Sequence, residues 1–166
     1  MNFPISPSQT IGPFSHEAWH WACAISRDAP RSPDTVSIGG VLVDGAGSPI
    51  NDAMIEVWAP QAATEASALP GFRRVPTDDA GAFVFQVPRP APGEPAALVT
   101  IFARGLVLHQ FTAVFLDATQ SPVLAQVAAE RRPTLVAQQT GERIYTWNIA
   151  MQGPAETVFF DYTGRA

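Results

Sequence analysis

Lysine is missing from this chain and cysteine occurs once, so several kinds of site are excluded at the outset. The 166-residue sequence has a net charge of -5, and all 10 of its basic residues are arginines. Partners such as nucleic acids and anionic membranes are recognised by clustered cations, and no basic run is present. Because Cys23 stands alone, neither an intrachain disulfide nor a four-thiolate zinc site can form.

A secretory leader and long apolar runs are also missing. The N-terminus has no basic stretch followed by an apolar one, and Pro4, Pro7 and Pro13 interrupt any helix there. We therefore expect neither a signal peptide nor a membrane span, and a cytoplasmic location. Hydrophobic residues make up 46% of the chain and charged residues only 15%. This balance predicts that part of the apolar surface is covered by a partner.

The patterns that are present favour strands. Short apolar or alternating segments bounded by Gly, Pro, Asp or Asn recur along the chain. They are Val36 to Val43, Ala53 to Trp58, Gly81 to Val87, Ala97 to Arg104, Phe111 to Leu116, Tyr145 to Met151 and Val158 to Tyr162. The turn-rich run from Asp44 to Pro49 predicts a hairpin between the first two. The pattern indicates one all-β domain, a sandwich or a barrel.

Helices and loops account for the rest. Ser121 followed by Pro122 predicts the start of one short helix that runs to about Glu130, and His16 to Ile25 is a weaker helical candidate. The stretches from Ala59 to Pro76 and from Pro88 to Pro95 have no periodic apolar pattern. We expect both to be loops that contribute little to the core.

Few residue patterns resemble an active site. His16 and His20 could ligate one metal on a helix, but surface histidines are the simpler interpretation, and His109 is isolated in sequence. No glycine-flanked serine elbow or phosphate loop is present. Asp78 and Asp79 precede a glycine, which is typical of carboxylates that cap a turn. The sequence therefore contains no complete catalytic site.

Arg104 is the most suggestive single charge. It ends an apolar strand and precedes Gly105, so its guanidinium could leave the sheet and point into a loop-lined cleft, where it would suit a carboxylate. A solvated arginine at a strand end fits the same pattern. The residues alone leave both interpretations open.

Several motifs together carry a family resemblance. In chain order the sequence reads SPSQTIGPF, GGVLVDGAGSPINDAMIEVWAP, DDAGAFVF, IFARGLVLH, RRPTLVA and ETVFFDY. In this order they resemble the α chains of heteromeric intradiol ring-cleaving dioxygenases. The resemblance implies an antiparallel β-sandwich with loop-rich connections and an αβ heteromer of higher order. It also implies an arm, residues 1–34, that contributes to a partner's active site, and a sandwich domain, residues 35–166.

The same resemblance implies that iron lies elsewhere. In the family's β chains, Fe(III) is held by two tyrosines and by a His-x-His pair on a strand. The matching strand here reads Ala96-Ala97-Leu98, and the only tyrosines, Tyr145 and Tyr162, are in late strand segments. The resemblance thus implies a metal-free chain beside an iron-binding β subunit. We expect Leu98 to be packed, so that Leu98→Ala would cost about 2 to 5 kcal/mol.

What remains for this chain is a supporting role. The resemblance places Thr10, Gly12 and Pro13 beside the partner's bound aromatic acid, with Arg104 near the same pocket. It implies cleavage of protocatechuate with O2 to 3-carboxy-cis,cis-muconate, a step of aromatic catabolism in the β-ketoadipate pathway. For the N-terminal residues, an arm of turn residues without substrate contact is the alternative.

Two other functions stay open at this point. One is a stand-alone sandwich that binds carbohydrate or peptide without catalysis. The other is a subunit of a related intradiol enzyme for hydroxyquinol or another catechol, although such relatives usually carry their own ligands. A neighbouring reading frame with a His-x-His pair and two loop tyrosines would favour the heteromer.

Overall fold

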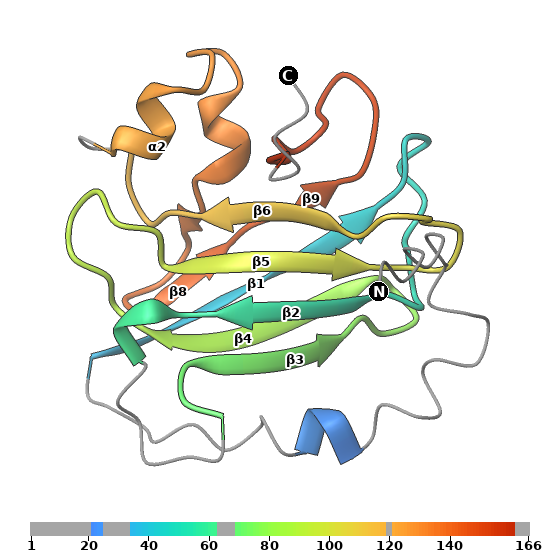
Figure 1. The fold of residues 1–166 in the computed structure, drawn as a ribbon, viewed down its shortest axis with the longest axis horizontal. Helices are drawn as coiled ribbons and strands as arrows, with labels where there is room; N and C mark the ends of the chain where they lie inside the picture. The colour runs from blue at the N-terminus through green and yellow to red at the C-terminus, as the bar shows by residue number, and fades with distance from the viewer. Residues whose placement is uncertain (1–20, 25–33, 63–68, 119–120, 162–166) are drawn as a thin grey trace, which may run out of the picture.

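Two stacked β-sheets form the molecule in a computed structural model that describes residues 21–24, 34–62, 69–118 and 121–161 (Figure 1). One sheet has the order β4-β1-β8-β7, with β9 also paired to β1, and the other has the order β3-β2-β5-β6. The strands are β1 Thr35–Val43, β2 Met54–Trp58, β3 Phe72–Pro76, β4 Ala82–Pro88, β5 Ala97–Phe102, β6 Gln110–Val114, β7 Gln138–Gln139, β8 Ile144–Thr146 and β9 Ile149–Ala150. The predicted all-β sandwich is confirmed.

Strand direction differs between the sheets. Every pair in the four-stranded sheet is antiparallel. In the other sheet β1 pairs with β4 in antiparallel fashion but with β8 and β9 in parallel. The expected antiparallel arrangement therefore describes one sheet fully, whereas the second is mixed.

The core lies between the two sheets, and alternation along the strands produces it. In β4, Phe83, Phe85 and Val87 are buried, while Val84 between them is exposed. The Phe83 ring stacks on Phe85 and meets the edge of Trp147. Alternate residues of a strand point to opposite faces, so this spacing presents one apolar face to the opposite sheet.

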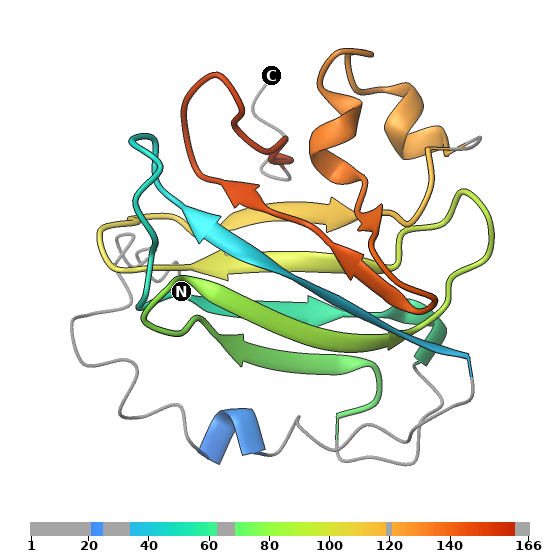
Figure 2. The ribbon, with the colours of Figure 1, turned by 180° about the vertical axis from the view of Figure 1, so that it is seen from behind.

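The predicted hairpin between the first two strands is wrong. β1 and β2 belong to different sheets, which Figure 2 shows from behind, and only the bridge from Val43 to Pro49 links the ends of this turn. β1 already pairs on one side with β4 and on the other with β8 and β9. Because both of its edges are occupied, the chain must cross to the opposite sheet instead of folding back.

The described residues of the segment from Ala59 to Pro76 contain more regular structure than the loop we expected. They include the short 3-10 helix η1 (Pro60–Ala62) and the edge strand β3. Ala59 and Ala62 are buried in the core, so the expectation that this stretch contributes little to the core is also wrong. Adjacent arginines in β3 obscure its alternation. The other predicted loop, Pro88 to Pro95, contains no strand beyond Pro88.

Two late segments also differ from prediction. Tyr145 to Met151 is split into β8 and β9, and β7 was not predicted at all because it is only two residues long. Val158 to Tyr162 is no strand over its described part, where a single bridge joins Phe160 to Phe111. Pairing that is limited to one or two residues leaves little periodic signal in a sequence.

The predicted helix starts where expected but is shorter. α2 (Pro122–Ala125) begins after Ser121, whose Oγ accepts a hydrogen bond from the Leu124 amide. It ends at Ala125 and not near Glu130. The Arg132 side chain donates to the carbonyls of Ala125 and Val127, which stabilises turns in place of further helix. A second short 3-10 helix, η2 (Arg132–Leu135), follows.

Earlier in the chain, residues 21–24 are helical, within the weaker candidate from His16 to Ile25, whose other residues lie outside the described part. No helix in the described ranges is long and apolar enough to cross a bilayer.

Candidate functional site

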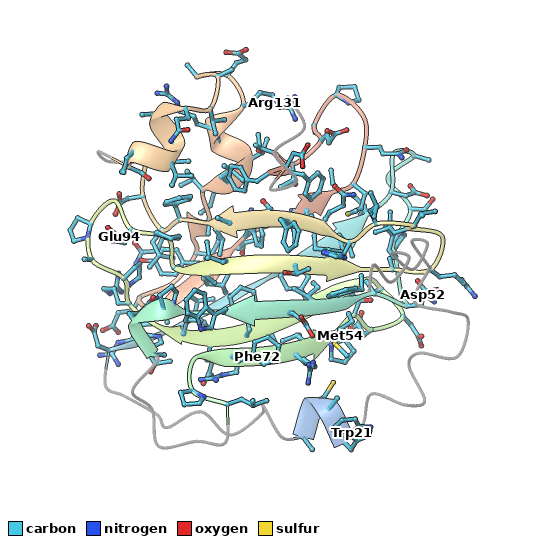
Figure 3. All side chains as sticks on the ribbon, in the orientation of Figure 1. Trp21, Asp52, Met54, Phe72, Glu94 and Arg131 are labelled. Atoms are coloured by element: carbon cyan, nitrogen blue, oxygen red, sulfur yellow. The ribbon has the colours of Figure 1, made fainter. Side chains whose placement is uncertain are left out.

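The candidate positions on β5 lie at its two ends. Ala96 and Leu98 are at its start, and Arg104 follows its last residue, Phe102. At about 3.3 Å per residue, Leu98 and Arg104 are about 20 Å apart along the chain direction. In Figure 3, the labelled residues Glu94 and Asp52 lie at opposite ends of the four-stranded sheet. Residues at the two ends of β5 cannot act together on one small molecule.

Ala96 is closed off completely. Its exposed fraction is 0%. Its amide donates to the Val114 carbonyl at 2.8 Å, and its carbonyl accepts from Nε2 of Gln61 at 2.9 Å. An imidazole at this position would have to displace core side chains. Ala96, which matches the first histidine of the family's pair, is therefore packed in the core.

Leu98 is only partly buried, so the expectation of full packing needs correction. It contacts a second apolar cluster and lines a cavity of about 250 Å³ on the outer face of the four-stranded sheet. The cavity walls are Glu56, Trp58, Phe72, Leu98, Val99, Thr100, Phe111 and Thr112. Truncating a half-buried leucine removes less apolar contact than truncating a core leucine, and its cost falls below the range expected from sequence.

These walls do not fit ferric iron. Trivalent iron needs hard anionic oxygens and imidazoles. The one carboxylate in the lining, Glu56, pairs with Nε of Arg74 at 2.8 Å. Across the described ranges, no group of three or more His, Cys, Asp or Glu side chains could hold a metal. We derive no reaction step through a metal on this chain.

Tyr145 has a structural role. It is buried in β8, and its hydroxyl accepts a hydrogen bond from Nη1 of Arg89 at 3.0 Å. This bond is the main reason why the pKa of Arg89 is raised above its ordinary value, and Asp34 adds to the effect. The interpretation of Tyr145 as a packed strand residue is confirmed. Tyr162 lies outside the described residues.

Arg104 stands at the other end of β5 and is held by a carboxylate. Its Nε lies 2.8 Å from Oδ2 of Asp52, and the side chains are 62% and 20% exposed respectively. Neither of the two cavities described in this section includes Arg104. It is thus an exposed arginine at a strand end that is held by Asp52, and its role in binding a substrate carboxylate stays a prediction.

Asp52 was not singled out in the sequence. β2 pairs with β5 so that Met54 faces Phe102, and continuing this register by two residues brings Asp52 opposite Arg104. Directly opposed residues of antiparallel strands have side chains within contact distance. The pairing depends on a register between distant segments, which no local pattern reveals.

The loop after Arg104 exposes apolar side chains. Gly105 has a φ of +89°, and the chain turns sharply there. Val107 and Leu108 are 60% and 57% exposed. His109 is exposed too, and its ring lies against Phe102 and Phe111. Neighbouring exposed aliphatic residues are typical of a surface that another chain covers.

The remaining sequence candidates divide into two groups. Asp78 caps a turn as predicted, because its Oδ1 accepts from the amides of Ala80 and Ala82. The other group lies outside the described residues: Thr10, Gly12, Pro13, His16 and His20.

The RRPTLVA motif is structural. Arg131 donates through Nη2 to the Glu156 carbonyl at 2.8 Å and so ties the segment after α2 to the C-terminal part of the chain. A cavity of about 670 Å³ lies beside this contact. Its walls include Val123, Val127 and Phe160. Of the predicted substrate-binding residues, Arg104 is the one within the described ranges, and it does not line this cavity.

Comparison with known proteins gives a consistent result. No family model matches the chain. A protocatechuate 3,4-dioxygenase alpha chain from Burkholderia cepacia is 32% identical across an alignment that covers 94% of this chain and 96% of the relative. A protein of the same name from Pseudomonas putida is 29% identical across an alignment that covers 96% of this chain and 97% of that one.

Solved structures agree on the fold. The dioxygenase domain of a carbohydrate-binding fusion from Streptomyces sp. SirexAA-E has a TM-score of 0.56 at 16% identity and covers 75% of this chain and 85% of its own. For 3-chlorocatechol 1,2-dioxygenase from Rhodococcus opacus 1CP the TM-score is 0.53 at 18% identity, with coverage of 75% and 62%. With the full-length similarity in sequence, the chain belongs to the family of protocatechuate 3,4-dioxygenase alpha chains.

Proposed function

We propose that this chain is the non-catalytic α subunit of a protocatechuate 3,4-dioxygenase. In this proposal a homologous β subunit holds the Fe(III), and the complex cleaves protocatechuate with O2 to 3-carboxy-cis,cis-muconate. The iron supplies the activation of the catechol when it is bound on the partner. This chain contributes the wall of the substrate pocket and part of the oligomer.

One observation carries the proposal. The chain is similar over nearly its full length to alpha chains. Yet the two positions of the family's His-x-His pair are a fully buried alanine and a leucine in an apolar cavity. A subunit that has the family's fold but lacks its iron ligands is expected to act through its surface on a site in another chain.

The surface groups available for this are of two kinds. Arg104 is a tethered cation at the end of β5, and a guanidinium favours an anionic aromatic acid over a neutral catechol. Thr10, Gly12 and Pro13 of the N-terminal arm, residues 1–34, supply a hydroxyl, a close backbone approach and a fixed φ. Their shared task would be to orient the substrate and to exclude water.

Co-expression with a homologous chain that has a His-x-His pair and two loop tyrosines tests the proposal. The chain purified alone should be colourless and free of iron. The complex should absorb in the visible through tyrosinate-to-iron charge transfer and should convert protocatechuate. Stoichiometric ferric iron in the isolated chain, or full activity of the partner without it, would contradict the proposal.

The preference of the complex among substrates distinguishes protocatechuate 3,4-dioxygenase activity from related intradiol activities. Protocatechuate, catechol and hydroxyquinol should be compared on the same complex. We expect the highest kcat/KM for protocatechuate, because it alone carries a carboxylate for Arg104. A preference for hydroxyquinol would assign the chain to a different intradiol enzyme.

A further inference from the structure

We propose that Asp52 is a positioning residue for substrate selection. Its carboxylate holds Nε of Arg104, and the two terminal amino groups of the guanidinium then present a fixed two-point site for a planar carboxylate. The inference rests on the proposed function, in which Arg104 faces the aromatic acid. Asp52 lies within the motif GGVLVDGAGSPINDAMIEVWAP, but the resemblance gave it no role.

The geometry of the pair supports this role. Asp52 Oδ2 lies 2.8 Å from Arg104 Nε, and the Asp52 side chain is 20% exposed against 62% for Arg104. A largely buried carboxylate is costly unless a cation accompanies it. The less exposed member thus fixes the more exposed one.

The N–H donors of Arg104 that have no partner determine which kind of ligand the guanidinium can bind. Within the described part of the chain, neither terminal amino group of Arg104 makes a hydrogen bond. A guanidinium has five N–H donors in a planar fork, and occupation of its Nε side leaves the end-on edge for a bidentate partner. A carboxylate matches this edge, and the hydroxyl groups of an uncharged catechol do not.

Hydrogen bonds of the residue that follows Asp52 hold this part of the backbone in place. The next residue, Ala53, donates to Thr77 Oγ1 at 3.0 Å and accepts from the Thr77 amide at 3.0 Å. Thr77 is buried. These contacts secure the start of β2 against the end of β3, so the carboxylate is presented from a rigid element. Such support is what a precise binding group requires.

The same sheet offers a matched control. Glu56 and Arg74 are also cross-strand partners, with Nε 2.8 Å from Oε1. Their side chains are 25% and 29% exposed, so Arg74 is much less available to a ligand than Arg104. Glu56→Gln removes a charge from an equivalent ion pair without touching the proposed carboxylate site.

The experiment uses the complete complex with its iron-bearing partner. Dissociation constants for protocatechuate and for catechol are measured without O2 from the change in visible absorption, and KM and kcat are measured with O2. Arg104→Gln should weaken protocatechuate binding about tenfold to hundredfold. Asp52→Asn, which preserves shape, should weaken it about threefold to tenfold, because the guanidinium remains but is less ordered.

The double variant is the decisive measurement. If Asp52 acts through Arg104, Asp52→Asn combined with Arg104→Gln should bind protocatechuate as weakly as Arg104→Gln alone. Catechol binding and the Glu56→Gln complex should match the parent. Additive losses, or equal losses for catechol, would overturn the positioning role.

Failures at different levels can be told apart. A colourless, inactive parent complex would overturn the proposed function itself. An active parent with an unaffected Arg104→Gln variant would overturn the substrate role of Arg104 and, with it, the inference. A weakened Arg104→Gln variant beside an unaffected Asp52→Asn variant would overturn the inference alone.

Discussion

The two ends of β5 differ in how far their side chains are buried. At its start, Ala96 is sealed in the core and Leu98 lines an apolar cavity. At its far end, Arg104 is exposed and paired with Asp52. The start is ordinary packing, whereas the end keeps an exposed charge in an ion pair. This contrast is consistent with our proposal that the chain acts through its surface.

The largest effect is expected at the start of β5, where the comparison would fail if a metal-binding side chain could be accommodated. Ala96→His would insert an imidazole where the exposed fraction is 0%. Overpacking together with a buried polar ring should cost about 3 to 5 kcal/mol of unfolding free energy. Urea unfolding at a fixed chain concentration measures it.

Leu98→His is the control for this variant, because the Leu98 side chain borders a cavity. It should cost about 1 to 2 kcal/mol, less than Ala96→His, and bind no iron. A stable Ala96→His protein would mean that this end is not closed.

The far end of β5 should respond mainly in function. Arg104→Ala should raise the KM for protocatechuate by a factor that corresponds to about 1.5 to 3 kcal/mol, the usual range for a charge-assisted contact. Steady-state kinetics of the complex with protocatechuate and catechol measure it, and the partner's iron content is the control. Equal losses for both substrates would reduce this end to a structural contact.

Leu98→Ala tests how far the start of β5 is filled. Because the side chain is only partly buried, we expect a loss of about 1 to 2 kcal/mol. Ile101→Ala, at a position of 0% exposure in the same strand, provides the comparison and should cost about 2 to 5 kcal/mol. If both variants lost the same unfolding free energy in urea, the cavity beside Leu98 would be closed in the assembled protein.

The smallest effect is expected from the N-terminal arm. If the Thr10 hydroxyl binds the substrate carboxylate or a water beside it, Thr10→Ala should cost about 0.5 to 1.5 kcal/mol of binding. The KM for protocatechuate in the complex measures it, with catechol as the control. No change would leave the arm as a tether and would place substrate selection on Arg104.

Much of the sandwich could be predicted because its strands alternate. β4 overlaps the strand predicted from Gly81 to Val87, and the helix begins after Ser121 as expected. β3 was missed because Arg73 and Arg74 interrupt its alternation, although Arg73 is buried and Arg74 pairs with Glu56. Cross-strand partners make such residues acceptable in a strand, and the partners are distant in sequence.

The candidate site was predicted in part for the same reason. Arg104 could be singled out because an arginine between an apolar strand and a glycine is a local pattern. Asp52 could not, since it lies in an ordinary turn and acquires its partner only through the register of β2 against β5. The predicted roles of Thr10, Gly12 and Pro13 remain predictions.

By itself, the sequence determined which residue types this chain can offer. It provides no lysine and a single cysteine, and it has alanine and leucine at the two positions that the resemblance matches to the family's histidine ligands. The tertiary structure alone decided that Ala96 is sealed while Leu98 borders a cavity, and that Asp52 holds Arg104. Residue types are local properties of the chain. Burial and strand register depend on contacts between segments far apart in sequence, and they are set only when both sheets have formed.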